Sequence, residues 1–155
     1  MNLRMNYRAA NPGAFKAMMA MEQHVSGQFE DKVLYELLKI RVSQINGCAF
    51  CMDMHAKDLM KLGNYGEHIL LLSVWREVPI FTEKQRVMLE MAEVVTRISE
   101  HGVPLELYNK VREHYSETEI VNLIMAINLI NSWNRIAITT GMYPGCFNLN
   151  DKREK

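Results

Sequence analysis

The sequence predicts an all-α fold, a single-domain bundle of about six to seven helices. Glycine and proline, the residues that most often interrupt helices, number only 8 and 4 among 155 residues. Apolar residues recur at spacings of three and four along most of the chain, as they do on the buried face of a helix. The sequence has no run of alternating polarity that would predict a strand. We expect residues 1–155 to form one domain, with a solvated tail from about residue 148.

The composition excludes several classes of function. Hydrophobic residues make up 48% of the chain and charged residues 23%, which is the balance of an ordinary globular protein. Lys plus Arg (18) equals Asp plus Glu (18), so the net charge gives no reason to bind nucleic acid or an anionic membrane. No run approaches the roughly 20 apolar residues of a membrane span, and residues 1–13 lack the apolar stretch of a secretory signal. We therefore expect a cytoplasmic protein.

Two helices are expected at residues 12–27 and 31–46. Asn11 and Pro12 provide an N-cap and a first helical residue for the first of them. The second is amphipathic and ends where Gly47 follows an asparagine. Its apolar stripe consists of Val33, Leu34, Leu37, Leu38, Val42 and Ile45.

A third helix is expected from Cys48 to a stop at Gly63. Cys51, His55 and Leu59 lie at successive i+4 positions, so they share one face of this helix. The chemically reactive candidates therefore occupy its first two turns. Residues 67–75 predict a short apolar helix that ends before Pro79, and we expect that helix to be buried.

Capping boxes predict the starts of two long helices, at Thr82 and at Ser116, with a shorter helix after Pro104 between them. The last helix is expected to end near Tyr143 and is apolar enough for the core or for a subunit interface. The segments LLKIRVSQING and MAINLINSW are weakly similar to each other, because in both an apolar helical stretch ends in Ile-Asn followed by a small residue.

The pair Cys48 and Cys51 is the sharpest chemical feature. In a reducing compartment such a pair is redox-active, metal-binding or inert. Two intervening residues at a helix start bring both sulfurs within range of a disulfide, and the helix N-terminus stabilises the reactive thiolate. His55, one turn beyond Cys51, can accept a proton. Glu36 on the preceding helix completes the candidate set if a tight turn packs the two helices together.

Each of these residues also has a structural interpretation. Glu36 alone would be an exposed carboxylate, and Cys48, Cys51 and His55 could supply three ligands to zinc. Structural zinc needs a fourth ligand, and the remaining candidate ligands are scattered along the chain. They are Cys146, His24, His68, His101 and His114. We expect the third cysteine, Cys146, to be a lone thiol without a catalytic role.

The segment SQINGCAFCMDMH, preceded by Glu36, resembles the AhpD-like alkylhydroperoxidase branch of the carboxymuconolactone decarboxylase family. The spacing Glu-x11-Cys-x2-Cys-x3-His matches at Glu36, Cys48, Cys51 and His55. The resemblance implies an all-helical fold of the AhpD-like type and a homo-oligomer, either a trimer or a hexamer. It extends over nearly the whole chain, including Gly63, Trp75-Arg76-Glu77, Phe81-Thr82, Glu93, Thr96 and Asn134-Arg135.

The resemblance implies an antioxidant dithiol peroxidase without a bound cofactor or metal. Cys51 would be the peroxidatic cysteine and Cys48 the resolving cysteine, with His55 and Glu36 as a proton relay. The implied partners are a peroxide substrate and an external dithiol reductant, either a protein or a lipoyl-type dithiol. The helix dipole alone favours Cys48 as the more acidic thiol, so the order of the two roles follows from the resemblance and from His55.

Phe50 departs from the family pattern, in which the best-studied peroxidases have a histidine immediately before the second cysteine. Phenylalanine cannot transfer a proton, so slower peroxidase turnover or a different acceptor is expected. The alternatives that remain are a general disulfide reductase, a decarboxylase-like enzyme that does not use its thiols, and a metal-binding structural domain.

Overall fold

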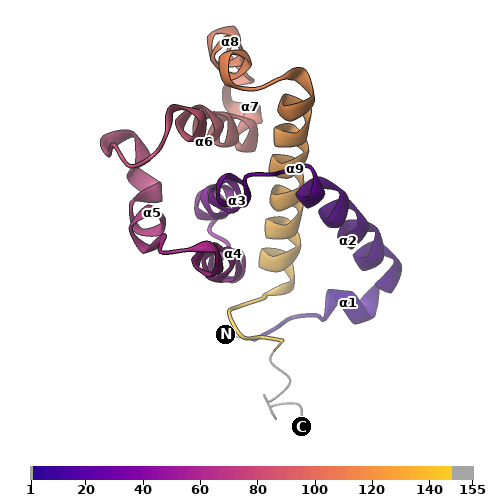
Figure 1. Ribbon diagram of the computed structural model, residues 1–155. Coiled ribbons are helices and arrows are strands. Elements are labelled where there is room, and N and C mark those ends of the chain that lie inside the picture. Colours follow the sequence, from indigo (N-terminus) through magenta and orange to yellow (C-terminus); the bar gives the residue numbers. More distant parts are fainter. Residues whose placement is uncertain (1, 148–155) are drawn as a thin grey trace.

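The computed structural model describes residues 2–147, and every regular element in that range is helical (Figure 1). The predicted solvated tail from about residue 148 lies outside the described residues. No helix in the described part of the chain is long and apolar enough to cross a membrane. The elements are α1 (Tyr7–Ala10), α2 (Pro12–Gly27), α3 (Lys32–Asn46), α4 (Ala49–Leu62), α5 (Gly66–Leu71), the 3₁₀ helix η1 (Leu72–Glu77), α6 (Glu83–Thr96), α7 (Ile98–His101), α8 (Leu105–His114) and α9 (Glu117–Thr140).

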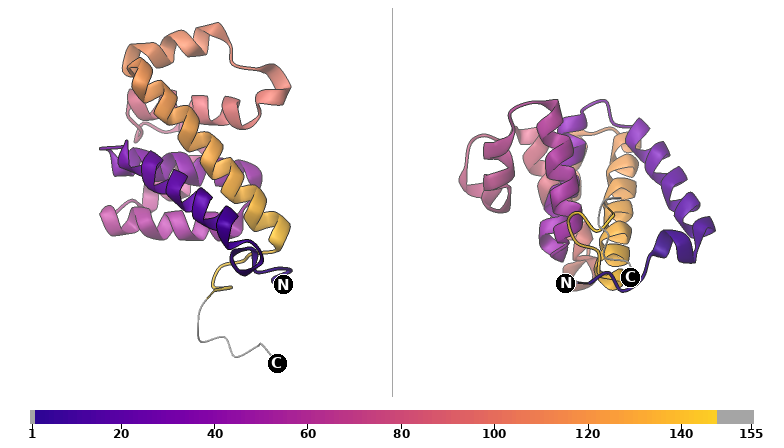
Figure 2. Two further views of the ribbon diagram at one scale, coloured as in Figure 1. Left: turned by 90° about the vertical axis from the view of Figure 1, so that its right-hand side faces the viewer. Right: turned by 90° about the horizontal axis from the view of Figure 1, so that it is seen from below.

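The long helix α9 is the axis of the fold. It runs between α1 and α2 on one side and α3, α4 and α6 on the other (Figures 1 and 2). Helix α3 is enclosed by α4, α6 and α9, and Leu37, Leu38 and Val42 of its predicted stripe are completely buried. Burying a leucine side chain contributes about 1.5–3 kcal/mol, so this stripe anchors α3 firmly in the core. Helices α3 and α9 therefore form the frame that holds α4.

Local capping interactions account for the helix starts, and they confirm those predictions. The Asn11 side chain accepts a hydrogen bond from the Ala14 N–H at 3.0 Å. At α6 and α9 the capping boxes are complete, because Thr82 and Ser116 each accept from the third helical residue, whose side chain accepts in return. Each box satisfies two amide donors that the helix itself leaves free.

The structure adds two helices that the sequence did not predict and shortens a third. Helices α1 and α7 have only 4 residues each, too few for a periodic pattern. Helix α9 ends at Thr140 instead of near Tyr143, because Gly141 adopts a left-handed conformation with φ of 74°. A Cβ atom at residue 141 would lie 3.0 Å from the Asn2 carbonyl oxygen, so the close approach of the N-terminal segment also requires glycine.

The predicted buried helix over residues 67–75 is wrong in two respects. The segment divides into α5 and the 3₁₀ helix η1, and no residue of α5 is buried. Only Leu72 and Trp75 are fully buried, Ile69 packs against the core at its edge, and Leu70 is 76% exposed. Side chains three residues apart in a 3₁₀ helix lie directly above one another, so burying residues 72 and 75 leaves the other apolar residues outside.

Glu93 ties three elements together at one end of the core. Its carboxylate accepts hydrogen bonds at 2.8 Å from Trp75 Nε1, Arg76 Nη1 and Arg41 Nε, which belong to η1 and α3. Burial alone would raise the pKa of Glu93, but the hydrogen bonds from Trp75, Arg76 and Arg41 outweigh it, so the pKa is lowered. The ionised carboxylate is therefore the form that the fold stabilises.

Candidate active site

The tight turn between α3 and α4 places Cys48 at the start of α4. Gly47 adopts a left-handed conformation with φ of 70°, which ends α3 and reverses the chain. The Cys48 N–H then donates to the Ser43 carbonyl at 2.9 Å, and the Cys48 sulfur accepts from the Cys51 N–H at 3.4 Å. Cys48 is therefore the N-cap residue of α4, beside the positive end of its dipole.

Cys48 and Cys51 are joined by a disulfide, with their Cα atoms 5.4 Å apart. They are only 1% and 2% exposed, so both sulfurs lie beneath the molecular surface. A reagent must therefore enter the protein to reach either of them.

His55 and Glu36 contact each other, with His55 one turn beyond Cys51 on α4. The His55 Nδ1 atom lies 2.8 Å from Glu36 Oε2, and both side chains are largely buried. The four residues singled out from the sequence are thus brought to the facing sides of α3 and α4. The third cysteine, Cys146, is a free, half-buried thiol in the turn after α9.

Two charged residues that the sequence did not identify extend this pair. Lys39 Nζ lies 3.1 Å from Glu36 Oε1 and 3.4 Å from Glu22 Oε1, so one ammonium bridges two carboxylates. The i, i+3 spacing from Glu36 could have identified Lys39 as its partner. Glu22 could have been identified because it is a charged residue at a position of α2 that continues the apolar spacing of Phe15 and Met18.

The charges around Glu36 keep its carboxylate ionised. Burial raises the pKa of Glu36, but the hydrogen bond and charge of His55 and the ion pair with Lys39 outweigh that effect, so the pKa is lowered. Burial and the Glu22 carboxylate together raise the pKa of Tyr35, so its hydroxyl stays protonated and donates to Glu22 at 3.0 Å.

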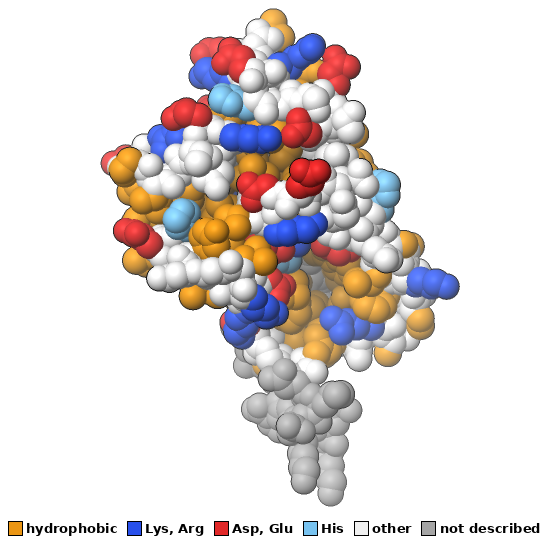
Figure 3. Space-filling view, viewed as in Figure 1, with side chains coloured by type: hydrophobic (Ala, Val, Ile, Leu, Met, Phe, Trp, Pro, Cys, Tyr) orange, Lys and Arg blue, Asp and Glu red, His pale blue; other side chains and the backbone are white. Residues whose placement is uncertain are grey.

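An apolar pocket of about 390 Å³ opens onto Cys51 and His55. It lies between α4, α9 and the pair α1 and α2, where Figure 3 shows a hollow lined with hydrophobic side chains. Cys51 lines the pocket and Cys48 does not. Phe50 contributes to its wall and packs edge-to-face on Phe147, with the ring centroids 6.2 Å apart. The apolar lining comes mainly from Tyr7, Phe15, Met19, Phe50, Met54, Trp133, Ala137 and Met142.

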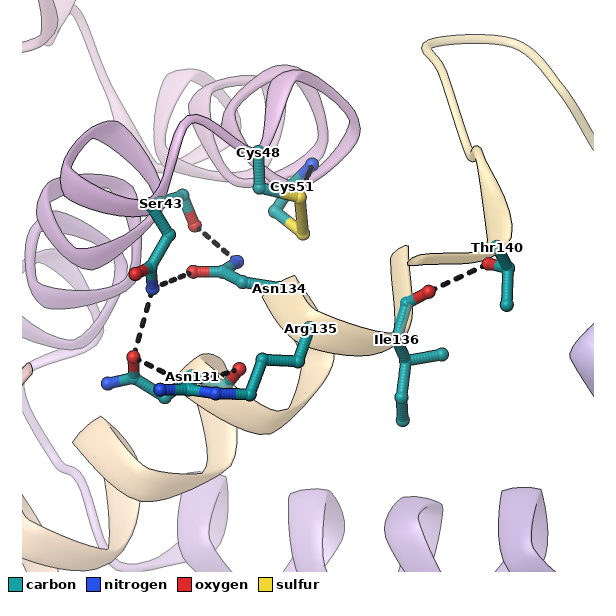
Figure 4. The surroundings of a disulfide bond; sticks show 9 residues. Ser43, Cys48, Cys51, Asn131, Asn134, Arg135, Ile136 and Thr140 are labelled. Atoms are coloured by element: carbon teal, nitrogen blue, oxygen red, sulfur yellow. Dashed lines mark hydrogen bonds between the residues drawn. A yellow bond between two sulfur atoms is a disulfide. The ribbon is translucent and has the colours of Figure 1, made fainter. Parts of the chain in front are cut away.

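A second group that the sequence did not identify lies on the other side of the disulfide (Figure 4). Asn46 Nδ2 donates to the Asn131 and Asn134 side-chain oxygens at 2.9 Å, and Asn134 Nδ2 donates to Ser43 Oγ at 3.0 Å. These bonds hold the turn that contains Gly47 against α9. Asn46 and Asn131 are the asparagines of the Ile-Asn pairs at the ends of the two similar segments LLKIRVSQING and MAINLINSW. The sequence similarity therefore marks two residues that contact each other.

The alternative of a zinc site formed by Cys48, Cys51 and His55 does not match the cluster of possible ligands in the described residues. Over residues 2–147, the side chains that come close enough together to share a metal ion are Glu36, His55 and Asp58, and neither cysteine is among them. Their charges are already engaged: Glu36 pairs with Lys39, and Asp58 pairs with Lys61. A reversible dithiol is the chemistry that this arrangement supports best.

Comparison with known proteins gives a match to a family model and two relatives by sequence. The model of the carboxymuconolactone decarboxylase family matches residues 12–94. The uncharacterized protein YdfG of Bacillus subtilis is 44% identical over 141 residues, which cover 91% of this chain and 96% of YdfG. The alkyl hydroperoxide reductase AhpD of Coxiella burnetii is 42% identical over 62 residues, 40% of this chain and 25% of AhpD.

A crystal structure supports the same likeness. A protein of unknown function from Agrobacterium tumefaciens, with a suggested role as the antioxidant defence protein AhpD, superposes with a TM-score of 0.89 at 44% identity. The match covers 92% of this chain and 99% of that protein. The all-helical, AhpD-like fold predicted from the sequence is thereby confirmed.

Proposed function

The chain belongs to the carboxymuconolactone decarboxylase family, and from the chemistry of its site we propose that it is an antioxidant dithiol peroxidase. The observation that carries this proposal is that Cys51, paired with Cys48, lies beside His55 in a pocket of about 390 Å³. An apolar pocket with a nucleophile and a base at its wall suits an organic hydroperoxide.

In the proposed cycle, His55 takes the thiol proton of Cys51, and Glu36 stabilises the resulting imidazolium. The Cys51 thiolate attacks the terminal peroxide oxygen. The S–O bond forms as the O–O bond breaks, and the leaving alkoxide takes the proton from His55 to become an alcohol. Cys51 is then a sulfenic acid.

The Cys48 thiol then gives up its proton, and the resulting thiolate attacks the sulfenic sulfur of Cys51. The S–S bond forms, and the leaving hydroxide takes up that proton to become water. An external dithiol, either a protein or a lipoyl-type compound, then supplies two electrons and two protons by thiol–disulfide exchange and restores both thiols. Cys51 lines the pocket and Cys48 does not, which supports the order of roles.

The proposal includes assembly and location. We propose that the protein works in the cytoplasm as a homo-oligomer. The apolar side chains of Leu70 and Val74, which are exposed along α5 and η1, support association through this surface. Sedimentation of the purified protein would measure the number of subunits.

Thiol mapping across a panel of peroxides tests the proposed reaction. Reduced protein treated with one equivalent of cumene hydroperoxide, tert-butyl hydroperoxide or hydrogen peroxide should form the Cys48–Cys51 disulfide, detected by mass spectrometry after blocking free thiols. The apolar pocket predicts faster reaction with the organic peroxides. Cys146→Ser should behave like the wild type. Free thiols after excess peroxide, or faster oxidation by small disulfides than by any peroxide, would replace the proposal with a disulfide reductase or a thiol-independent enzyme.

Removing the relay should slow thiol oxidation without unfolding the protein. Glu36→Gln and His55→Ala are each expected to reduce the rate of peroxide-dependent disulfide formation at pH 7 by about 10²-fold, because the proton acceptor is lost or unsupported. Stopped-flow measurement of the oxidation rate checks this. Asp53→Asn is the matched control, since Asp53 is a carboxylate on α4 that pairs with Lys57 and lies outside the pocket. Equal rates in all four proteins would remove His55 and Glu36 from the mechanism.

A further inference from the structure

We propose that Lys39 and Glu22 are positioning residues that act through Glu36 and His55 to set the pH at which Cys51 becomes reactive. This inference rests on the proposed function for the role of Cys51. It gives a role to the buried charges of Lys39 and Glu22, which the proton relay itself does not require.

The contacts form an unbroken chain of alternating charge. His55 on α4 contacts Glu36 at 2.8 Å, Glu36 contacts Lys39 at 3.1 Å, and Lys39 contacts Glu22 on α2 at 3.4 Å. The chain therefore crosses from α4 through α3 to α2, and the pocket that contains Cys51 lies along it. A change of charge at any of its members changes the electrostatic potential at the others.

Lys39 is held in place as a buried charge. Its side chain is only 6% exposed, and its ammonium lies 3.9 Å from the centre of the Tyr35 ring. Burying an ammonium is costly unless carboxylates compensate it, and here two of them do. Because Lys39 has little access to water, its charge acts on Glu36 with little screening.

Glu22 is anchored as firmly from the other side. Its carboxylate accepts from Tyr35 Oη at 3.0 Å, from Lys39 Nζ at 3.4 Å and from Trp133 Nε1 at 3.0 Å. The donors come from α3 and α9, so Glu22 connects α2 to both helices of the frame. Replacing this carboxylate with the isosteric amide removes its charge while keeping an acceptor oxygen for Trp133.

The two charges have opposite signs, so their removal has opposite effects. Lys39 favours the ionised forms of Glu36 and of Cys51, whereas Glu22 disfavours them. Lys39→Met should therefore move the onset of Cys51 reactivity to higher pH, and Glu22→Gln should move it to lower pH. The other charged groups that face the site are the same in both variants: Arg8 of α1, and Asp58 and Lys61 of α4.

Alkylation of the reduced protein measures this onset without any peroxide. The rate of Cys51 modification by iodoacetamide, located by mass spectrometry, is recorded from pH 5 to pH 10. We expect the midpoint of Lys39→Met to rise by about one pH unit, a roughly tenfold slower reaction below the midpoint, and that of Glu22→Gln to fall by a similar amount. Lys39→Arg should keep the wild-type midpoint, because it keeps the charge.

Matched controls come from the exposed pair on α4. Lys57→Met and Asp53→Asn remove the same charges from a surface ion pair whose lysine side chain is 68% exposed, and they should leave the midpoint unchanged. Shifts of Lys39→Met and Glu22→Gln in the same direction, or no shift in either, would overturn the inference. If Lys39→Met does not fold, the fall in midpoint for Glu22→Gln decides the question alone.

The outcome is separable from the fate of the proposed function. A wild-type protein whose thiols ignore peroxide, but whose alkylation midpoints shift in opposite directions, would refute the peroxidase and retain the charge chain. Rapid peroxide oxidation with unchanged alkylation midpoints would support the peroxidase and refute the role of the charge chain.

Discussion

Replacing Cys51 with serine is expected to lower peroxide consumption by about 10³-fold or more, to the rate of the uncatalysed reaction, because the nucleophile of the covalent step is lost. Cys51 is the cysteine that lines the pocket, and its substitution leaves the Cys48 thiol 1% exposed in the wild-type packing. Consumption of cumene hydroperoxide with excess dithiothreitol as reductant measures the effect.

The complementary variant separates the two cysteines. Cys48→Ser should still react with one equivalent of peroxide, and it should accumulate a sulfenic acid at Cys51 that dimedone traps. Cys146→Ser should turn over like the wild type, since Cys146 is unpaired in the turn after α9. The opposite pattern, with trapping at Cys48 in Cys51→Ser and no reaction in Cys48→Ser, would exchange the proposed roles.

Replacing Glu93 with glutamine is expected to cost about 3 kcal/mol of unfolding free energy and about 9 °C in Tm. The amide can still accept from Trp75, but it no longer compensates the guanidinium of Arg41, whose side chain is 13% exposed. Urea denaturation followed by circular dichroism provides the measurement. Glu106→Gln, which breaks an exposed ion pair with Lys110, should leave the stability essentially unchanged.

The pH dependence of unfolding gives the same residue a second test. The folded protein lowers the pKa of Glu93 from its ordinary value of 4.5, so the unfolded chain binds this proton more readily. The stabilisation is complete well above pH 4.5 and is lost as the pH falls through the folded-state pKa. Glu93→Gln should therefore lose stability less steeply than the wild type as the pH falls from 4.5 to the folded-state pKa of Glu93. Parallel curves for the two proteins would mean that the carboxylate contributes no net charge stabilisation.

Most of the helical framework was predictable because its signals are local. The capping boxes at Thr82 and Ser116 and the turn at Gly47 each determine a boundary within a few residues of sequence. Helices α1 and α7 were missed because a single turn of helix has no periodicity and forms only with tertiary support. The burial of residues 67–75 was predicted wrongly because an apolar run does not indicate which of its faces meets the core.

The sequence identified the members of the site that lie on adjacent turns of one helix, together with Glu36, which the tight turn at Gly47 brings close from the preceding helix. Cys48, Cys51 and His55 share one helix, so their spacing implied their proximity. Glu22 and Trp133 are hydrogen-bonded across a separation of 111 residues, and no local pattern records such a pairing. The sequence marked Asn46 and Asn131 as similar, yet only the packing of α3 on α9 shows that they contact each other.

The sulfur of Cys48 has two duties, since it both begins α4 and takes part in the proposed redox cycle. The first turn of α4 is therefore coupled to the oxidation state of the protein: each turnover changes the atom that caps the helix carrying Cys51. Cys48→Ser would keep the cap while ending disulfide formation, whereas Cys48→Ala would remove both. Serine and alanine at this one residue thus distinguish the part the sulfur plays in helix architecture from its part in electron transfer.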